Sequence, residues 1–481
     1  MKLRHFTLFL LIPIFAFCKT KDKINHTNKF NNHPYTEGWY LKPNEKGDDV
    51  RFFAIGGWSV PGYTPNKNDI ADRANADIFK AQARNLNILI TNYEYLKDYM
   101  SEDGRIMMTF QPFQTVLRYA NKMSNAREKG LESGYYISQF LKESVDRPDF
   151  IQTIDEDIKL SINKRFANVE LAFSPIDEVA LGLYNNHWFV PPAIGDKIYE
   201  RIKTINPNAM VYIDLTGHGR GSSFFFEKRY LKDHSTMPKD PPYEAVKSKI
   251  ASKYAERAIA SGEGLPLLVF NESYSGVPSY NFTHNKYTYK SFKPEEFSDY
   301  YENIRQFAEG YKGNGNVFGL NCYQDFYEHP ALAGVSVDAI RAGLGDPSIP
   351  IWLYFDGNGH SKPENISVDE YIKELKCQIY TSIIHGATGV LFWNNMTKTP
   401  AVWNALQPVL DEMKENIDIF KLNTLERNIN DDIHINIKID ENGKKYIIAS
   451  NSNKTKALPL NIKRIEKKSL SPLEVYISSL N

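Results

Sequence analysis

A repeating alternation of apolar runs and amphipathic segments constrains the fold of this chain more than any other feature. From about residue 51 onward, short runs rich in β-branched and aromatic residues are each followed by a loop and a segment with helical periodicity. The runs are continuous rather than alternating, which is typical of strands buried on both faces. Strands that alternate with helices pair in parallel through right-handed crossovers. The runs span residues 51–58, 85–93, 105–113, 168–174, 209–217, 265–271, 316–323, 350–357 and 388–393.

This pattern predicts an α/β fold in which the strands close into a (β/α)8 TIM barrel. The runs exceed the eight strands of such a barrel by one. Because the segments around it keep ordinary spacing, we assign the run at 265–271 to an insertion after the fifth strand. An open, doubly wound sheet is the structural alternative, although no Gly-rich phosphate loop follows the first run.

The pattern changes after about residue 425. Apolar and polar residues alternate there, and the turn-forming stretches "ENGK" and "NSNK" interrupt the alternation. This is typical of antiparallel strands with one buried face. We therefore expect a barrel domain over residues 46–425 and a small antiparallel β-sandwich over residues 426–481 that packs on it.

The first 18 residues predict export. "MKLRHFTLFLLIPIFAFC" has a short basic start and an apolar core of signal-peptide length, shorter than a bilayer-spanning helix. Cys18 directly after this core resembles the bacterial lipoprotein signal, although Phe17 stands where that signal has a small residue. The polar residues 19–45 predict a tether. We expect a periplasmic or cell-surface protein that contacts the membrane only through a lipid on Cys18.

The net charge, the cysteines and the histidines indicate which ligands and cofactors to expect. The 58 basic residues balance the 58 acidic ones, which argues against nucleic acid and favours a neutral ligand. Cys322 and Cys377 lie in apolar segments and are expected to be buried. His218, His360 and His385 share no ligand spacing, so neither a metal nor another cofactor is expected.

Polar and aromatic side chains follow most of the apolar runs. The active site of a (β/α)8 barrel lies at the carboxyl ends of the strands and in the loops that follow them. We therefore expect the residues at these positions to surround one mouth, together with Trp188 in the loop "YNNHWFVPP". The candidates are Trp58, Tyr93, Glu94, Asp177, Glu178, Asp214, His218, Glu272, Tyr323, Asp325, Asp356 and Trp393.

Acids and aromatics at one mouth are suited to cleavage of a glycosidic bond. One carboxylic acid protonates the leaving oxygen, and a second carboxylate attacks the anomeric carbon or activates water. Aromatic faces pack on sugar rings, and amide or hydroxyl groups bind sugar hydroxyls. The sequence therefore favours a carbohydrate substrate. The alternative is a surface lipoprotein on the same scaffold that binds glycan without cleaving it.

Four motifs resemble the TIM barrels of the glycoside hydrolase superfamily, of the clan A type. These are "RFFAIGGWSVPGY", "LAFSPIDEVALG", "VFGLNCYQDFY" and "HGATGVLFW", and a small β-sandwich after the barrel is also similar. The resemblance implies an acid/base after the fourth strand, here Glu178 beside Asp177, and a nucleophile after the seventh, here Asp356. The family usually has Asn-Glu and Glu at these positions. An Asn-Glu pair occurs at Asn271-Glu272, which makes Glu272 the rival acid/base if the run before it is a barrel strand.

Structural roles are the alternative for each acid. Asp177 and Glu178 could cap and open the next helix, where both would stabilise its dipole. Asp356 lies in the turn-rich loop "DGNGH", where an Asp commonly binds its own backbone.

Overall fold

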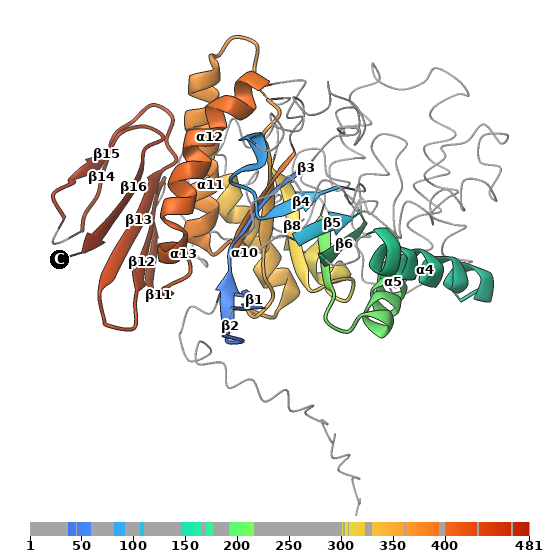
Figure 1. Ribbon diagram of the computed structural model, residues 1–481. Helices are drawn as coiled ribbons and strands as arrows, with labels where there is room; N and C mark the ends of the chain where they lie inside the picture. Colours follow the sequence, from blue (N-terminus) through green and yellow to red (C-terminus); the bar gives the residue numbers. More distant parts are fainter. Residues whose placement is uncertain are drawn as a thin grey trace, which may run out of the picture.

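The computed structural model of this chain is shown in Figure 1. It describes residues 37–44, 46–58, 81–91, 106–109, 146–165, 169–176, 192–215, 301, 304–305, 307–322, 330–359, 362–393, 400–430, 432–462 and 465–480.

Eight parallel strands close into a barrel in the order β10-β3-β4-β5-β6-β7-β8-β9. The (β/α)8 prediction is therefore confirmed, and the open-sheet alternative is wrong. β7 pairs directly with β8, so the barrel closes without the run at 265–271, which lies outside the described residues. The barrel strands are β3 (Ala54–Trp58), β4 (Ile88–Ile90), β5 (Ile106–Thr109), β6 (Glu170–Ile176), β7 (Met210–Leu215), β8 (Val317–Cys322), β9 (Trp352–Asp356) and β10 (Gly389–Trp393).

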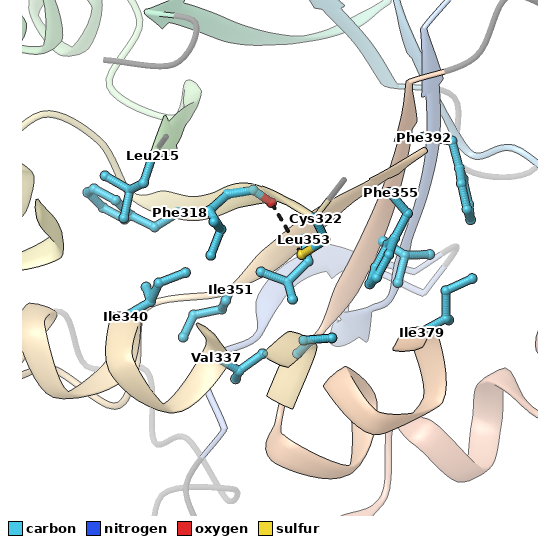
Figure 2. Close-up of a cluster of buried hydrophobic side chains, with 14 of the residues drawn as sticks. Leu215, Phe318, Cys322, Val337, Ile340, Ile351, Leu353, Phe355, Ile379 and Phe392 are labelled. Atoms are coloured by element: carbon cyan, nitrogen blue, oxygen red, sulfur yellow. Dashed lines mark hydrogen bonds between the residues drawn. The ribbon is translucent and has the colours of Figure 1, made fainter. Parts of the chain in front are cut away.

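Side chains alternate between two hydrophobic layers along each barrel strand. One set fills the barrel interior and includes Met210 and Tyr212 of β7 and Trp352 and Tyr354 of β9. The intervening residues point outward toward the helices. Figure 2 shows this outer layer, where side chains of β8 and β9 face those of α10 and α11. Both layers are apolar, which explains why the strands appear in the sequence as continuous apolar runs.

Helices cover the outside of the barrel (Figure 1). α11 begins at a capping box, in which Ser367 and Glu370 satisfy each other's backbone N–H groups, and it ends at Gly386 with φ of 102°. The described helices are α4 (Pro148–Leu160), the π-helical turn η2 (Ser161–Arg165), α5 (Pro192–Ile205), α10 (Leu332–Leu344), α11 (Val368–His385), α12 (Pro400–Glu415) and α13 (Ile417–Phe420).

A short antiparallel hairpin closes the amino end of the barrel. β1 (Tyr40–Pro43) pairs with β2 (Asp49–Phe52), and the Tyr40 ring packs edge-on against Trp352 in the barrel interior. The Tyr40 hydroxyl donates to Glu170 at the start of β6, at 2.8 Å, and burial together with Glu170 raises the pKa of Tyr40. Residues 37–43, expected to belong to the tether, are therefore part of the fold.

The C-terminal region forms two antiparallel sheets, as the pattern predicts. One is a four-stranded sheet in the order β11-β12-β13-β16, and the other is the two-stranded sheet β14-β15. Apolar residues of both sheets pack together, while the opposite face of the larger sheet contacts α11. The strands are β11 (Asn423–Asn430), β12 (Ile433–Ile439), β13 (Lys445–Asn451), β14 (Leu458–Pro459), β15 (Ser469–Leu470) and β16 (Val475–Leu480).

Candidate active site at the carboxyl end of the barrel

Five polar or aromatic residues lie at the carboxyl ends of the described barrel strands. Side chains alternate between the two faces of a strand, so a residue an even number of positions from an interior residue also faces the interior. By this count five residues face the interior at the carboxyl end: Trp58, Asp214, Asn321, Asp356 and Trp393. On the same five strands, the interior positions below them hold glycine, apolar or aromatic residues. Asp214 and Asp356 are 2% and 1% exposed. This end of the barrel therefore has the residues for chemistry on a substrate above it.

Two tryptophans occupy neighbouring strands at this mouth. Trp58 is the last residue of β3 and Trp393 the last of β10, and these strands pair with Gly57 opposite Phe392. Both tryptophans pack against the interior cluster and remain partly exposed. A partly exposed indole at the mouth of a barrel can pack on the apolar face of a sugar ring.

Asp356, the last residue of β9, has hydrogen bonds at both carboxylate oxygens. Oδ1 accepts from the backbone N–H of Asn358 at 3.0 Å, which is the turn contact that the sequence offers as a structural role. Oδ2 accepts from the Tyr371 hydroxyl of α11 at 3.0 Å. Burial and Asp356 together raise the pKa of Tyr371 well above its usual value, so this hydroxyl remains a donor at any physiological pH. The two donors fix the orientation of the carboxylate.

The fourth barrel strand ends immediately before the predicted acidic pair. β6 ends at Ile176, so Asp177 is the next residue and Glu178 the one after it. Two strands, β7 and β8, separate β6 from β9 in one direction around the barrel, and four separate them in the other.

The described part of the chain includes four of the thirteen predicted site residues. Trp58, Asp214, Asp356 and Trp393 lie at the carboxyl end as described above. The argument for Glu272 as acid/base required the run before it to be a barrel strand, and the barrel closes without that run. The predicted residues outside the described part are Tyr93, Glu94, Asp177, Glu178, Trp188, His218, Glu272, Tyr323 and Asp325.

Two residues of this mouth do not follow from the strand-end rule. Asn321 lies inside an apolar run, on β8, and counting in twos from Val317 would have placed it on the inner face. Tyr371 lies in the first turn of α11, and its approach to Asp356 depends on how the helix packs. No local pattern in the sequence gives that contact.

The cysteines and histidines of the described part of the chain are buried. Cys322 and Cys377 are buried, as predicted, and burial raises the pKa of the Cys377 thiol to about 12. His385 lies at the end of α11, facing His434 of β12. Within the described ranges, no group of three or more His, Cys, Asp or Glu side chains could hold a metal ion. None of the helices described is long and apolar enough to cross a membrane.

Comparison with known proteins gives matches only among solved structures. No protein-family model matches this chain, and no curated protein matches it. A glucosidase from Croceicoccus marinus is 10% identical, over 87% of this chain and 80% of its own, with a TM-score of 0.35. A family 51 α-L-arabinofuranosidase from Bifidobacterium longum is 9% identical, over 88% and 87%, with a TM-score of 0.36. Since these scores are low, the TIM barrel and the C-terminal antiparallel sheets are established by the strand pairing of this chain itself.

Proposed function

We propose that this protein is a glycoside hydrolase that cleaves an oligo- or polysaccharide with Glu178 as acid/base and Asp356 as the second carboxylate. The observation that carries the proposal is the place of Asp356, which is buried at the carboxyl end of the seventh barrel strand. Glu178 follows the end of the fourth strand by two residues. Loops that follow these two strands open at the same mouth of a (β/α)8 barrel.

Cleavage of a glycosidic bond requires the two carboxyl groups to have different roles. Glu178 would donate a proton to the leaving oxygen, while Asp356 would attack the anomeric carbon or activate a water molecule. A separation of about 5–5.5 Å between the carboxyl groups corresponds to retention of configuration, and one of about 6.5–9.5 Å to inversion. Trp58 and Trp393 would support the sugar ring, and Asp214 and Asn321 would bind its hydroxyl groups.

The test is release of reducing sugar from a panel of bacterial and plant polysaccharides by the chain that lacks residues 1–18. We expect hydrolysis of at least one polysaccharide. Binding to the same panel is measured in parallel by affinity electrophoresis. If a glycan binds and no glycan is cleaved, the second candidate function, a glycan-binding protein without catalysis, replaces the first.

One observation favours that second candidate. An Asp rather than the usual Glu follows the seventh strand, and both its oxygens accept hydrogen bonds from the protein itself. A carboxylate that only organises the turn would have the same contacts.

We also propose that the protein is exported through residues 1–18 and attached to the membrane by a lipid on Cys18. The basic start, the apolar core and the position of Cys18 support this proposal.

Tyr371→Phe is expected to lower kcat about tenfold, equivalent to about 1.4 kcal/mol, with little change in KM. The variant removes one of the two donors that fix the orientation of the Asp356 carboxylate, so the carboxylate should be held less often in the geometry that the reaction needs. The measurement is kcat and KM, determined separately, on whichever glycan is cleaved.

Tyr380→Phe is the matched control, because Tyr380 lies on the same helix and donates to Glu412 at 2.9 Å, outside the barrel. It should lose stability in a similar way without lowering kcat. An unchanged kcat in Tyr371→Phe would show that Tyr371 does not position a catalytic group.

A further inference from the structure

The interior residues of β7 and β9 place two carboxylates at different depths below the mouth of the barrel. Tyr212 of β7 stacks on Trp352 of β9 with ring centroids 6.3 Å apart, and its hydroxyl donates to the Trp352 carbonyl oxygen at 3.3 Å. These two residues therefore lie in one layer of the barrel interior. Asp214 and Tyr354 are the next interior residues on the same strands, and Asp356 follows Tyr354. Asp214 is therefore one layer deeper than Asp356.

Asn321 lies on the strand between these two carboxylates. It is the last interior residue of β8, which separates β7 from β9, and it pairs with Tyr354. Asn321 is 4% exposed, so it is buried to nearly the same extent as the two aspartates. Asp214, Asn321 and Asp356 together form the polar floor of the mouth.

The polar floor is rich in hydrogen-bond acceptors. A carboxylate accepts hydrogen bonds and donates none, whereas the Asn321 amide does both. A sugar hydroxyl or ammonium group can donate to the two carboxylates, but a sugar carboxylate or sulfate has no hydrogen to donate. The polar floor therefore suits sugars that bring donors to it.

The barrel strands bring no positive charge to the polar floor. Over the bounds that the structure gives for the eight barrel strands, no residue is Lys, Arg or His. Lys362, in the loop after β9, donates to the backbone carbonyls of Pro363 and Ile366. Burial and the Asp214 carboxylate raise the pKa of the Cys322 thiol well above its usual value, so this thiol remains uncharged. The charge that these strands give to the floor therefore comes from its two carboxylates.

A second negative charge brought to this floor would weaken binding. Like charges within one sugar ring of each other repel strongly where protein has replaced water. A neutral sugar avoids this repulsion and gains hydrogen bonds to the floor. Discrimination between two ligands can come from repulsion of one as much as from attraction of the other.

We propose that Asp214 accepts a hydrogen bond from a hydroxyl group of the sugar bound at Asp356, and that the two carboxylates together exclude sugars that carry a carboxylate or a sulfate. This selection rests on the proposed function, because it concerns the sugar that binds at the candidate active site. The substrate class is thus neutral glycans, and Asp214 is the residue that determines it.

The test uses a glucan, a galactan, a mannan and an arabinan, each before and after oxidation of its primary hydroxyl groups to carboxylates. This oxidation changes the charge of the sugar and hardly changes its size. Cleavage by the full chain is measured as reducing sugar, and binding by affinity electrophoresis. We expect a neutral polymer to be cleaved or bound about tenfold better than its oxidised form. Equal use of the two forms, or a preference for the oxidised form, would overturn the proposal.

Asp214→Asn tests the residue itself. The amide keeps the shape of the side chain and loses the charge, so the preference for the neutral form should fall about tenfold. Use of the neutral form should also decrease, because a hydrogen bond to a charged acceptor is lost. An unchanged preference would show that Asp214 does not select the sugar.

Asp346→Asn is the matched control for this variant. Asp346 lies before β9, at the opposite end of the barrel, and accepts from the backbone N–H of Ser348. The preference for the neutral form should be the same in Asp346→Asn as in the unaltered protein. The comparison of neutral and oxidised polymers on the unaltered protein needs no variant, so it decides the matter if Asp214→Asn does not fold.

Failure of this selection and failure of the proposed function give different results. A protein that cleaves neutral and oxidised polymers alike is a glycoside hydrolase without selection by Asp214. A protein that binds a neutral polymer without cleaving it fits the second candidate function, and its preference is then measured by binding. If neither form of any polymer is bound or cleaved, the proposed function and the selection both fail.

Discussion

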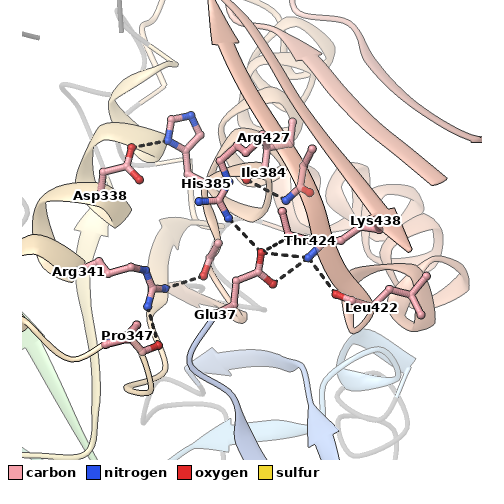
Figure 3. Close-up of polar contacts among 12 residues, drawn as sticks. Glu37, Asp338, Arg341, Pro347, Ile384, His385, Leu422, Thr424, Arg427 and Lys438 are labelled. Carbon is pink, nitrogen blue, oxygen red and sulfur yellow. Dashed lines mark hydrogen bonds and ion pairs between the residues drawn. The ribbon is translucent and has the colours of Figure 1, made fainter. Parts of the chain in front are cut away.

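Glu37→Gln is expected to lower the free energy of unfolding by about 3–5 kcal/mol, as for other buried charge pairs that lose one partner. The Glu37 side chain is 5% exposed and accepts from Lys438 at 2.8 Å and from Arg427 at 3.0 Å (Figure 3). Thr424 of β11 also donates to it. The substitution leaves the Lys438 ammonium, 1% exposed, without a counter-ion. Chemical denaturation of the two proteins measures the difference.

Two further variants test whether the loss of stability comes from the unpaired Lys438 charge or from replacing any Glu by Gln. Glu37→Gln/Lys438→Met removes both charges and should recover part of the lost stability. Glu309→Gln removes the acid of an exposed ion pair with Arg305 and should cost only about 0.3–0.5 kcal/mol. If Glu37→Gln costs no more than Glu309→Gln, the buried ion pair does not hold the N-terminal segment to the C-terminal sheet.

The stability that the buried Glu37 carboxylate contributes depends on pH and is lost in acid. Burial alone would raise the pKa of Glu37, but Lys438 and Arg427 outweigh burial and lower it from 4.5 to about 2. The carboxylate binds its proton more weakly in the folded state, so its contribution is complete above about pH 4.5 and is lost as the pH falls toward 2.

The barrel could be predicted from the sequence because its strands are buried on both faces, and such strands produce continuous apolar runs. Those runs lie within one or two residues of most strands. The first run was only partly correct: residues 51–52 end β2 in the hairpin, and the barrel strand begins at Ala54. Antiparallel and parallel pairing cannot be distinguished from apolar content when both segments are buried.

In the C-terminal sheet, polar residues that the sequence pattern predicts to be exposed are in fact buried. The alternation in "IHINIKI" predicts one buried face and one solvated face. In the structure His434, Asn436 and Lys438 are buried as well, against α11 and Glu37, and each makes a side-chain hydrogen bond there. The partners lie far away in the sequence. For the same reason, nothing in the polar N-terminal segment distinguishes Glu37 from the tether residues before it.

The positions of four candidate residues could be predicted because strand ends determine them. Asp214, Asp356, Trp58 and Trp393 follow from topology alone, because all parallel barrel strands end at the same rim. The hydrogen bond from Tyr371 to Asp356 does not, since it depends on the packing of α11 against β9. The sequence can therefore place a carboxylate at the rim of the barrel more readily than it can name the groups that orient that carboxylate.

Glu178→Gln and Asp356→Asn are each expected to reduce turnover of a cleaved glycan by about 10²–10⁴-fold, because neither amide can exchange a proton or attack carbon. Thermal midpoints of both variants, measured alongside kcat, should stay close to that of the unaltered protein. Turnover that survives in Glu178→Gln would assign the acid to another residue.

Asp346→Asn is the control that separates catalysis from turn formation at Asp356. Asp346 precedes β9 at the opposite end of the barrel, and its Oδ1 accepts from the backbone N–H of Ser348 at 2.8 Å, as Asp356 Oδ1 accepts from that of Asn358. Both substitutions disturb an Asp that binds the backbone two residues on, but only Asp356 lies at the mouth. Turnover should be nearly unchanged in Asp346→Asn. Equal and small effects in the two variants would make Asp356 a turn residue, and the second carboxylate would then have to be sought elsewhere on the rim, beginning with Asp214.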